Sequence, residues 1–209
     1  MLSLRAYVYI DSLQPQFAAI TGALSQGDVP LAGMAALYVE VSPGVKVYPL
    51  ADAALKASPV RLGFQMVERE FGLLEVHSSS QDDVKRAGEA ILQCLEVSRV
   101  EALVPRITAA QVISRVTDYQ AQLINRTKTG SLLIPGQSLF ILETEPAGHC
   151  ALLANSAEKA VGIRTVDVSF FGAYGRLLLS GTQGEVLVVS NAVKETFDRI
   201  ISQTRDRRI

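Results

Sequence analysis

One short run of the chain carries the residue types that could do nucleophilic chemistry: His77-Ser78-Ser79-Ser80-Gln81-Asp82-Asp83. A histidine near serines and acids could supply a general base beside a nucleophile. The members of a catalytic triad, however, are brought together by the tertiary fold and seldom adjoin in sequence. Ser80 and Asp83 instead have the spacing of a helix cap, which satisfies free backbone N–H groups. We therefore expect helix capping here and assign no catalytic residue.

Cysteine and histidine are scarce in the rest of the chain. Cys94 and Cys150 are the two cysteines, His77 and His149 are the two histidines, and no two of the four have the spacing of metal ligands. We therefore expect no zinc site and two buried, inert thiols. The phosphate-binding patterns G-x-x-x-x-G-K-S/T and G-x-G-x-x-G are also absent, so we expect no nucleotide cofactor.

The composition excludes several classes of protein. The 209 residues are 48% hydrophobic, which is enough for a substantial core. Twenty Lys and Arg against 21 Asp and Glu give a formal net charge of -1, without the basic excess of a nucleic-acid-binding surface. No apolar stretch approaches the ~20 residues that span a bilayer, and no signal peptide is visible. We expect a cytoplasmic protein that binds neither membrane nor nucleic acid.

The chain repeats itself at an offset of 103 residues. That offset pairs Gly33 with Gly136, Glu40 with Glu143, Pro43 with Pro146, Lys56 with Lys159 and Gly72 with Gly175, and it needs no gap from about 31 to 79. A period of this length indicates a duplicated domain, because solenoid repeats span about 20–50 residues. We predict two copies of one domain, residues 1–103 and 104–209.

Each copy has the pattern strand, helix, strand, helix, strand, strand, helix. Alternating and β-branched runs predict the strands, and apolar residues at helical spacing predict the helices. The ranges are 6–10, 15–25, 37–41, 47–55, 61–67, 73–77 and 80–95 in the first copy, and 111–113, 118–126, 139–144, 156–160, 164–170, 176–180 and 186–200 in the second. This order predicts an α+β fold in which each copy is one mainly antiparallel sheet with packed helices.

The turn of the last hairpin differs between the copies. The first copy has Val67-Glu68-Arg69-Glu70-Phe71-Gly72, and the second has Phe170-Phe171-Gly172-Ala173-Tyr174-Gly175. The shared glycines, Gly72 and Gly175, suggest a positive φ. A charged turn taken alone is most simply a solvated turn, and it becomes a candidate site only if several such turns meet at a symmetry axis.

Two matching helices carry a resemblance to a known family. Asp52-Ala53-Ala54-Leu55-Lys56-Ala57, and more loosely Asn155-Ser156-Ala157-Glu158-Lys159-Ala160, resemble a recurrent pattern of the bacterial microcompartment shell domain. The order of elements looks circularly permuted, and the tandem copies are similar to the pseudohexameric shell proteins of carboxysomes. Further stretches carry this similarity over nearly the whole chain: residues 7–14, 40–44, 67–69, 123–126 and 143–147.

The resemblance implies an assembly rather than an enzyme. Three chains would form a six-sided tile of ferredoxin-like domains around a central pore, within the carboxysome shell. Two such trimers can stack face to face around a chamber, and the pores of this subfamily have been seen open and closed. The family's edge lysine, which contacts neighbouring hexameric shell proteins, matches Lys56 and Lys159.

A gate follows if the charged turns line that pore. Glu68 of one subunit would pair with Arg69 of the next in a closed arrangement, and both would swing aside in an open one. The wider set of pore residues is Glu68, Arg69, Glu70, Phe71, Gly72, Phe170, Phe171 and Gly172. The family's setting implies small anionic cargo, such as ribulose bisphosphate and 3-phosphoglycerate, with Arg69 as the candidate contact. Asn125 and Arg126 are candidates for the chamber wall.

Two other classes of function stay open on the sequence alone. A duplicated α+β regulatory protein would bind a small molecule between its two copies and would be a monomer or dimer. A hydrolase would depend on His77 or His149.

Overall fold

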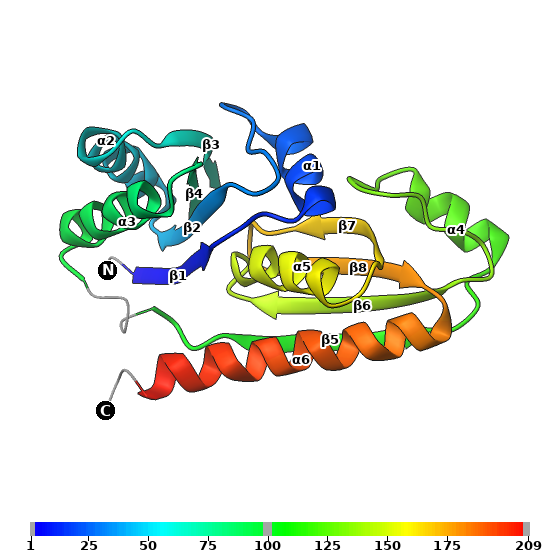
Figure 1. Ribbon diagram of the computed structural model, residues 1–209. Coiled ribbons are helices and arrows are strands. Elements are labelled where there is room, and N and C mark those ends of the chain that lie inside the picture. Colours follow the sequence, from blue (N-terminus) through cyan, green and yellow to red (C-terminus); the bar gives the residue numbers. More distant parts are fainter. Residues whose placement is uncertain (1–2, 98–101, 207–209) are drawn as a thin grey trace.

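The computed structural model describes residues 3–97 and 102–206 and contains two modules of the same architecture (Figure 1). The first module contains β1 (Ser3–Ile10), α1 (Pro15–Leu24), β2 (Ala35–Ser42), the short 3-10 helix η1 (Gly44–Lys46), α2 (Val47–Ala57), β3 (Arg61–Glu68), β4 (Phe71–Ser78) and α3 (Gln81–Leu95). The second contains β5 (Arg106–Ile113), α4 (Asp118–Asn125), β6 (Ser138–Glu145), α5 (His149–Ala160), β7 (Arg164–Ser169), β8 (Gly175–Gly181) and α6 (Gln183–Asp206). The predicted order of elements is confirmed in both copies.

Each module is built on one four-stranded antiparallel sheet, and the two sheets have matching strand orders, β1-β2-β4-β3 and β5-β6-β8-β7. Their registers match as well, because Tyr7 pairs with Val39 and Ala110 pairs with Leu142, at the same offset of 103 residues. The expected α+β fold is therefore confirmed. The domain boundary at 103/104 stays a prediction, and it lies in the connection between α3 and β5.

Helices cover one face of each sheet, α2 and α3 in the first module and α5 and α6 in the second (Figure 1). The sequence of α3 explains its position, because its periodic apolar residues face the sheet: Val84, Ala87, Ile91 and Leu95 are buried, and Leu92 is partly buried. At its start the Ser80 side chain accepts a hydrogen bond from the Asp83 N–H at 3.3 Å. The predicted cap is confirmed.

The other face of the first sheet packs against the second module. Phe170, from the end of β7, is surrounded by three aromatic rings of the first module, with centroids 6.0 Å away at Phe17, 5.4 Å at Tyr38 and 5.4 Å at Phe64. These residues belong to one core cluster that runs from β1 and α1 into α5 and α6. The two modules are therefore joined by a shared hydrophobic core.

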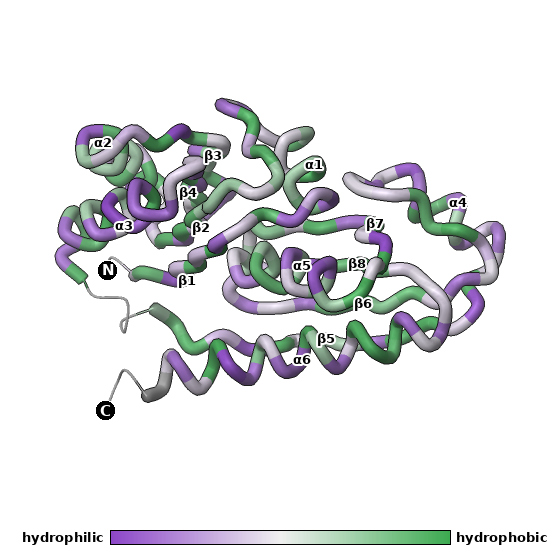
Figure 2. Tube along the Cα trace, viewed as in Figure 1, coloured by the Kyte–Doolittle hydropathy of each residue, from purple (hydrophilic) through white to green (hydrophobic). Residues whose placement is uncertain are grey.

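The helix that ends the second module is longer than its counterpart, with 24 residues in α6 against 15 in α3. Hydrophobic and hydrophilic residues alternate along α6 (Figure 2), and the helix packs on β6 and β8 with its buried apolar residues Val186, Val189, Val193 and Phe197. In the first module the ring of Tyr7 lies against Gly88 of α3. The second module has Ala110 on the strand and Ser190 on the helix, and a cavity of about 480 Å³ remains between β5 and α6.

The matched glycines of the second hairpin strand do not have the positive φ that we expected, and that prediction is wrong. Their role is close approach. A Cβ on Gly72 would collide with the carbonyl oxygen of Gly44, and a Cβ on Gly175 would collide with that of Ala147. In both modules a glycine is required because the chain that follows the matched proline crosses directly over this strand.

Among the residues that the structure describes, no helix is both long and apolar enough to cross a membrane. The charged C-terminal residues 207–209 lie outside the described residues, as do 98–101 in the connection between modules.

We predict that Gly72→Ala destabilises the fold by ~1–3 kcal/mol, the cost of overpacking a well-filled site. Gly184→Ala is the matched control, because a Cβ there meets no atom within 4 Å. It should be neutral or slightly stabilising, since alanine favours a helix. Unfolding in urea measures both variants. Equal stability of Gly72→Ala and the wild type would show that the crossing chain has room to move.

Candidate pore rim and the contact between modules

The turns of the two last hairpins lie against each other, β3–β4 from the first module and β7–β8 from the second. A Cβ placed on Gly172 would lie 2.8 Å from Oε2 of Glu68. Glu68, Arg69 and Glu70 are all exposed. The structure thus brings the candidate rim residues of the two modules together within one chain.

A left-handed backbone conformation marks the tip of each turn. Arg69 has a φ of 54° and Gly172, at the matching position, has a φ of 91°. The positive φ that we expected near these turns therefore falls three residues before Gly72 and Gly175. Gly72 itself lies in the paired strand β4 beneath Gly44, so it is not placed to act as a hinge of the turn.

Phe71 is held by a cation–π contact. The guanidinium carbon of Arg5 lies 3.7 Å from the centroid of the Phe71 ring. Arg5 also donates a hydrogen bond from Nε to Oε1 of Glu40 at 2.7 Å, in a nearly fully buried ion pair. The rim hairpin is thereby attached to the centre of the first sheet.

The Glu40 carboxylate also reaches the second module. Its Oε2 accepts a hydrogen bond from the N–H of Gly148 at 2.8 Å. Burial raises the pKa of Glu40, and the hydrogen bonds from Arg5 and from the Gly148 N–H partly oppose that rise. A buried carboxylate needs such donors, so separating the modules would leave one of its oxygens without a partner.

Phe170 lies elsewhere than we expected. Its side chain has no exposed surface and sits in the core between the modules, so it cannot line an open rim. Phe171 is partly buried, with its ring centroid 5.9 Å from that of Phe170. Sequence reasoning placed these rings at the rim because they occupy a turn. The burial comes from Phe17, Tyr38 and Phe64, which lie more than a hundred residues earlier in the first module.

Side chains of α5 cap the start of α1 across the contact between modules. Glu158 accepts hydrogen bonds from the N–H groups of Gln16 and Phe17 at 2.8 and 3.0 Å. Asn155 accepts from the N–H of Gln14 at 2.7 Å and donates to the carbonyl oxygen of Ser12 at 3.1 Å. The first module has no side-chain cap of its own on α1, so the second module supplies it.

The two candidate edge lysines lie at the exposed ends of matching helices. Lys56 is in the last turn of α2, where its Nζ lies 2.7 Å from the Asp52 carboxylate. Lys159 is in the last turn of α5 and lines a surface hollow with Asp11 and Glu195. Both positions also suit the negative end of a helix dipole, which is a sufficient structural reason for a lysine.

The two candidate chamber residues differ in what they contact. Asn125 uses both ends of its amide on one backbone residue, donating to the Leu133 carbonyl oxygen at 2.9 Å and accepting from the Leu133 N–H at 2.8 Å. It therefore holds the loop after α4 in place. Arg126, at the C-terminus of α4, is exposed.

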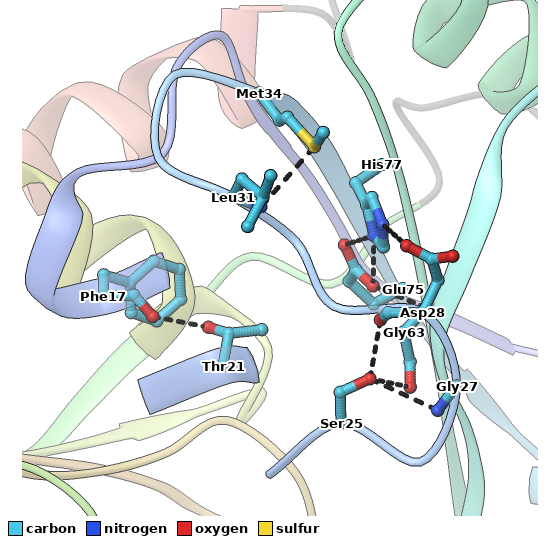
Figure 3. A network of polar contacts seen from close by, with 10 residues as sticks. All are labelled: Phe17, Thr21, Ser25, Gly27, Asp28, Leu31, Met34, Gly63, Glu75 and His77. Atoms are coloured by element: carbon cyan, nitrogen blue, oxygen red, sulfur yellow. Dashed lines mark hydrogen bonds and ion pairs between the residues drawn. The ribbon is translucent and has the colours of Figure 1, made fainter. Parts of the chain in front are cut away.

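His77 takes part in a carboxylate network rather than in a catalytic triad (Figure 3). Its Nδ1 lies 3.1 Å from Oε1 of Glu75, and its Nε2 lies 3.4 Å from Oδ1 of Asp28. Glu75 is fully buried and also accepts a hydrogen bond from the Gly63 N–H at 2.9 Å. Burial alone would lower the pKa of His77, but Glu75 and then Asp28 raise it above its usual value. The network ties the loop after α1 to β3 and β4.

The remaining sulfur and imidazole groups have different surroundings. Cys150 is buried, and burial raises the pKa of its thiol to about 12, as befits an inert side chain. Cys94 is exposed, so the prediction of two buried thiols is wrong for that residue. Burial lowers the pKa of His149 to about 4. Within residues 3–97 and 102–206, no cluster of His, Cys, Asp and Glu could hold a metal ion.

Comparisons with known proteins agree on one family. The CsoS1D N-terminal domain family matches residues 4–101. The chain is 41% identical over 199 residues to the carboxysome shell protein CcmP of Synechococcus elongatus, which covers 95% of this chain and 93% of that protein. It is 43% identical over 201 residues to the carboxysome shell protein CsoS1D of Hydrogenovibrio crunogenus, which covers 96% and 98%.

Solved structures give the same result. The fused permuted hexameric shell protein MSM0275 of the RMM microcompartment has a TM-score of 0.92 at 40% identity, over 95% of this chain and 98% of that one. The double-ringed trimeric shell protein MSM0271 of the same microcompartment has a TM-score of 0.91 at 40% identity, over 95% and 97%.

The fold and the duplicated hairpins define a tandem-domain, permuted bacterial microcompartment shell protein. Within that class, the chain belongs to the carboxysome shell protein family of CcmP and CsoS1D. It is thus a structural protein of the carboxysome shell and not an enzyme, and the resemblance drawn from its residues is confirmed.

We predict that His77→Gln destabilises the protein more at about pH 6 than at about pH 9. Because the folded state raises the pKa of His77, the charged imidazolium contributes stability below its ordinary pKa of ~6.5 and loses that contribution as the pH rises through the raised value. Free energies of unfolding at the two pH values measure the effect. His149→Gln is a control of opposite sign. Its ring stays neutral in the folded state, with a pKa lowered to about 4, but takes up a proton near pH 6 when unfolded, so replacing it should cost less at about pH 6 than at about pH 9. The same loss at both pH values for His77→Gln would contradict the network's electrostatic role.

Proposed function

We propose that three copies of the chain close into a six-sided ring whose central pore is rimmed by the two kinds of hairpin turn. The observation that carries the proposal is the contact of Glu68 with Gly172, because turns that meet within one chain can also meet around one axis. Two relatives support the ring, one described as a fused permuted hexameric protein and the other as a double-ringed trimeric protein. We extend the double ring, two stacked trimers, to this chain.

The contact between modules also supports ring closure. In each chain, α1 and β1 of the first module pack on α5 and β7 of the second. The matching surfaces, on α2 of the first module and α4 of the second, are left uncovered. A head-to-tail contact that repeats with a fixed rotation closes into a ring. Large apolar side chains are exposed on these two surfaces: Val45, Tyr48, Leu55, Tyr119 and Leu123.

Glu68 and Arg69 form the gate in this proposal. Both are exposed, and the left-handed conformation of Arg69 places its side chain at the tip of the turn. Ion pairs in water contribute only ~0–1 kcal/mol each, so three of them favour the closed state by a few kcal/mol at most. A ligand with a modest preference for either state can therefore reverse the balance.

The cargo is a small anionic metabolite of the size of a sugar bisphosphate or 3-phosphoglycerate. Three Arg69 guanidinium groups around one axis offer hydrogen bonds suited to phosphate and carboxylate oxygens. Lys56 and Lys159, exposed at the ends of α2 and α5, contact neighbouring hexameric tiles in the shell facet. Arg126 faces the chamber of a stacked pair of trimers.

A second candidate function is favoured by one cavity between the modules. It has a volume of about 250 Å³ and is lined by Val8, His149, Leu152, Ile200 and Gln203, among others. Neither ring nitrogen of His149 has a hydrogen-bond partner within the described residues. A small-molecule-binding regulatory protein would use such a cavity in a monomer or dimer.

We predict that native mass spectrometry detects a trimer or a hexamer, and no dimer. The reason is that the uncovered surfaces on α2 and α4 are complementary to each other rather than to themselves, so pairing leaves one of each exposed. A monomer or a closed dimer at micromolar concentration would refute the ring and favour the regulatory function.

We predict that Glu68→Ala combined with Arg69→Ala leaves the pore without its closed state. Removing both partners of each pair takes away the few kcal/mol that favour closure. Crystal structures of the wild type and of the variant measure the arrangement of the turns. Glu70→Ala is the control, because Glu70 lies outside the proposed pair and accepts from the Ser42 hydroxyl at 3.4 Å. Turns that still take both arrangements in the double variant would disprove the ion-pair gate.

A further inference from the structure

The uncovered surfaces on α2 and α4 carry different residues from their covered counterparts on α5 and α1. The changes on α2 complement the changes on and near α4. The offset of 103 residues relates the side chains of α5 that hydrogen-bond to the first module, and their partners near α1, to residues of α2 and of the segment near α4. Asn155 of α5 corresponds to Asp52 of α2, and its partner Ser12 corresponds to Arg115. Both free residues are exposed.

We propose that Asp52 of one chain and Arg115 of the next form an ion pair that joins neighbouring chains, a residue-level inference that rests on the ring proposed above. Within the chain, Asn155 donates to the Ser12 carbonyl oxygen at 3.1 Å and accepts from the Gln14 N–H at 2.7 Å. An aspartate at that position can accept but cannot donate. The Asp52 carboxylate would face the corresponding carbonyl oxygen, and neither group can donate a hydrogen bond. This arrangement is unfavourable unless a cation lies between or beside them.

Within the chain, Lys56 already lies 2.7 Å from the Asp52 carboxylate. Arg115 of the next chain supplies a second cation, on the side of the proposed contact. Arg115 stands at the position that matches Ser12, which is where the Asp52 carboxylate needs a hydrogen-bond donor. A guanidinium has five N–H groups, and their geometry fits a carboxylate. Asp52 also keeps one backbone partner in this arrangement, because Thr117 matches Gln14 and has a backbone N–H. The neutral pair Asn155 and Ser12 is thus replaced on the free surfaces by the oppositely charged pair Asp52 and Arg115.

A second exchange supports the same contact. Glu158 caps α1 within the chain, because Gln14 provides no side-chain cap. In the second module α4 caps itself, since the Thr117 hydroxyl accepts from the Gln120 N–H at 3.4 Å. The residue that matches Glu158 is accordingly free to be apolar, and it is Leu55. It would meet Tyr119, the counterpart of Gln16.

The exposure of these two side chains agrees with that pairing. Leu55 is 48% exposed and Tyr119 is 72% exposed in the single chain. Aromatic and apolar side chains of this size usually become buried in an interface core. The free surfaces thus carry one charged pair and one apolar pair at the two places where the covered contact uses amide and carboxylate hydrogen bonds.

Charge reversal tests the proposed pair. Asp52→Arg and Arg115→Asp should each raise the dissociation constant of the ring by about tenfold or more, because each puts like charges together at all three contacts. The double variant, with both changes in one chain, should restore assembly to within a few-fold of the wild type. Sedimentation velocity over a range of concentrations measures the three variants.

Three further measurements separate the pair from general effects. Asp82→Arg is the matched control, with the same change of charge at an exposed site that forms its ion pair with Lys85 on α3. Its assembly should equal that of the wild type. Asp52→Asn, which copies Asn155, should still assemble, with less dependence on salt than the wild type. Circular dichroism establishes that each variant is folded.

The outcomes are distinct. A wild-type trimer that is indifferent to both single reversals, or a double variant that fails to recover, would overturn the Asp52–Arg115 pair and leave the ring intact. A wild-type chain that remains monomeric would overturn the ring, and the pair with it.

Discussion

The buried carboxylate of Glu40 is the constraint on which the rest of the structure depends. One of its oxygens is bonded to Arg5 and the other to the N–H of Gly148, so both modules contribute to its satisfaction. Arg5 in turn stacks on Phe71 beside the rim. A group of this kind is tolerated in a core only when its donors are fixed, so the rim hairpin, the first sheet and the second module must keep one relative position.

In the proposed ring, the duplicated modules use one mode of contact twice, once within the chain and once between chains. Within the chain the contact is permanent, and the side chains of Asn155 and Glu158 hold α1 by accepting hydrogen bonds from backbone N–H groups at its start. On the free surfaces, the corresponding positions carry Asp52 and Leu55, which suit partners that arrive by diffusion. Charges increase the rate of encounter, and exposed apolar side chains provide area to bury afterwards. The proposed contact between chains would thus differ from the one within the chain because it has to form from separate molecules.

The sequence alone predicted the features that depend on the repeat or on neighbouring residues. The offset of 103 residues predicted two equal modules, and the spacing of Ser80 and Asp83 predicted a cap, because both depend on nearby residues. It failed where a role depends on distant parts of the chain. Gly72 is needed for the crossing of Gly44, Phe170 is buried by rings of the other module, and Cys94 lies on the outer side of an otherwise well-predicted helix. The Arg5–Glu40 pair left no signal except that both residues are charged within strands.

The left-handed Arg69 has a mechanical consequence. A residue with a side chain loses ~1–2 kcal/mol in that conformation, whereas glycine loses almost nothing. The turn of the first module is therefore slightly strained at Arg69, whereas the turn that contains Gly172 is unstrained. In the proposed ring, three strained turns and three unstrained turns would alternate around the pore. If the strained turns relaxed, all three would move together, and the outline of the pore would change between hexagonal and triangular.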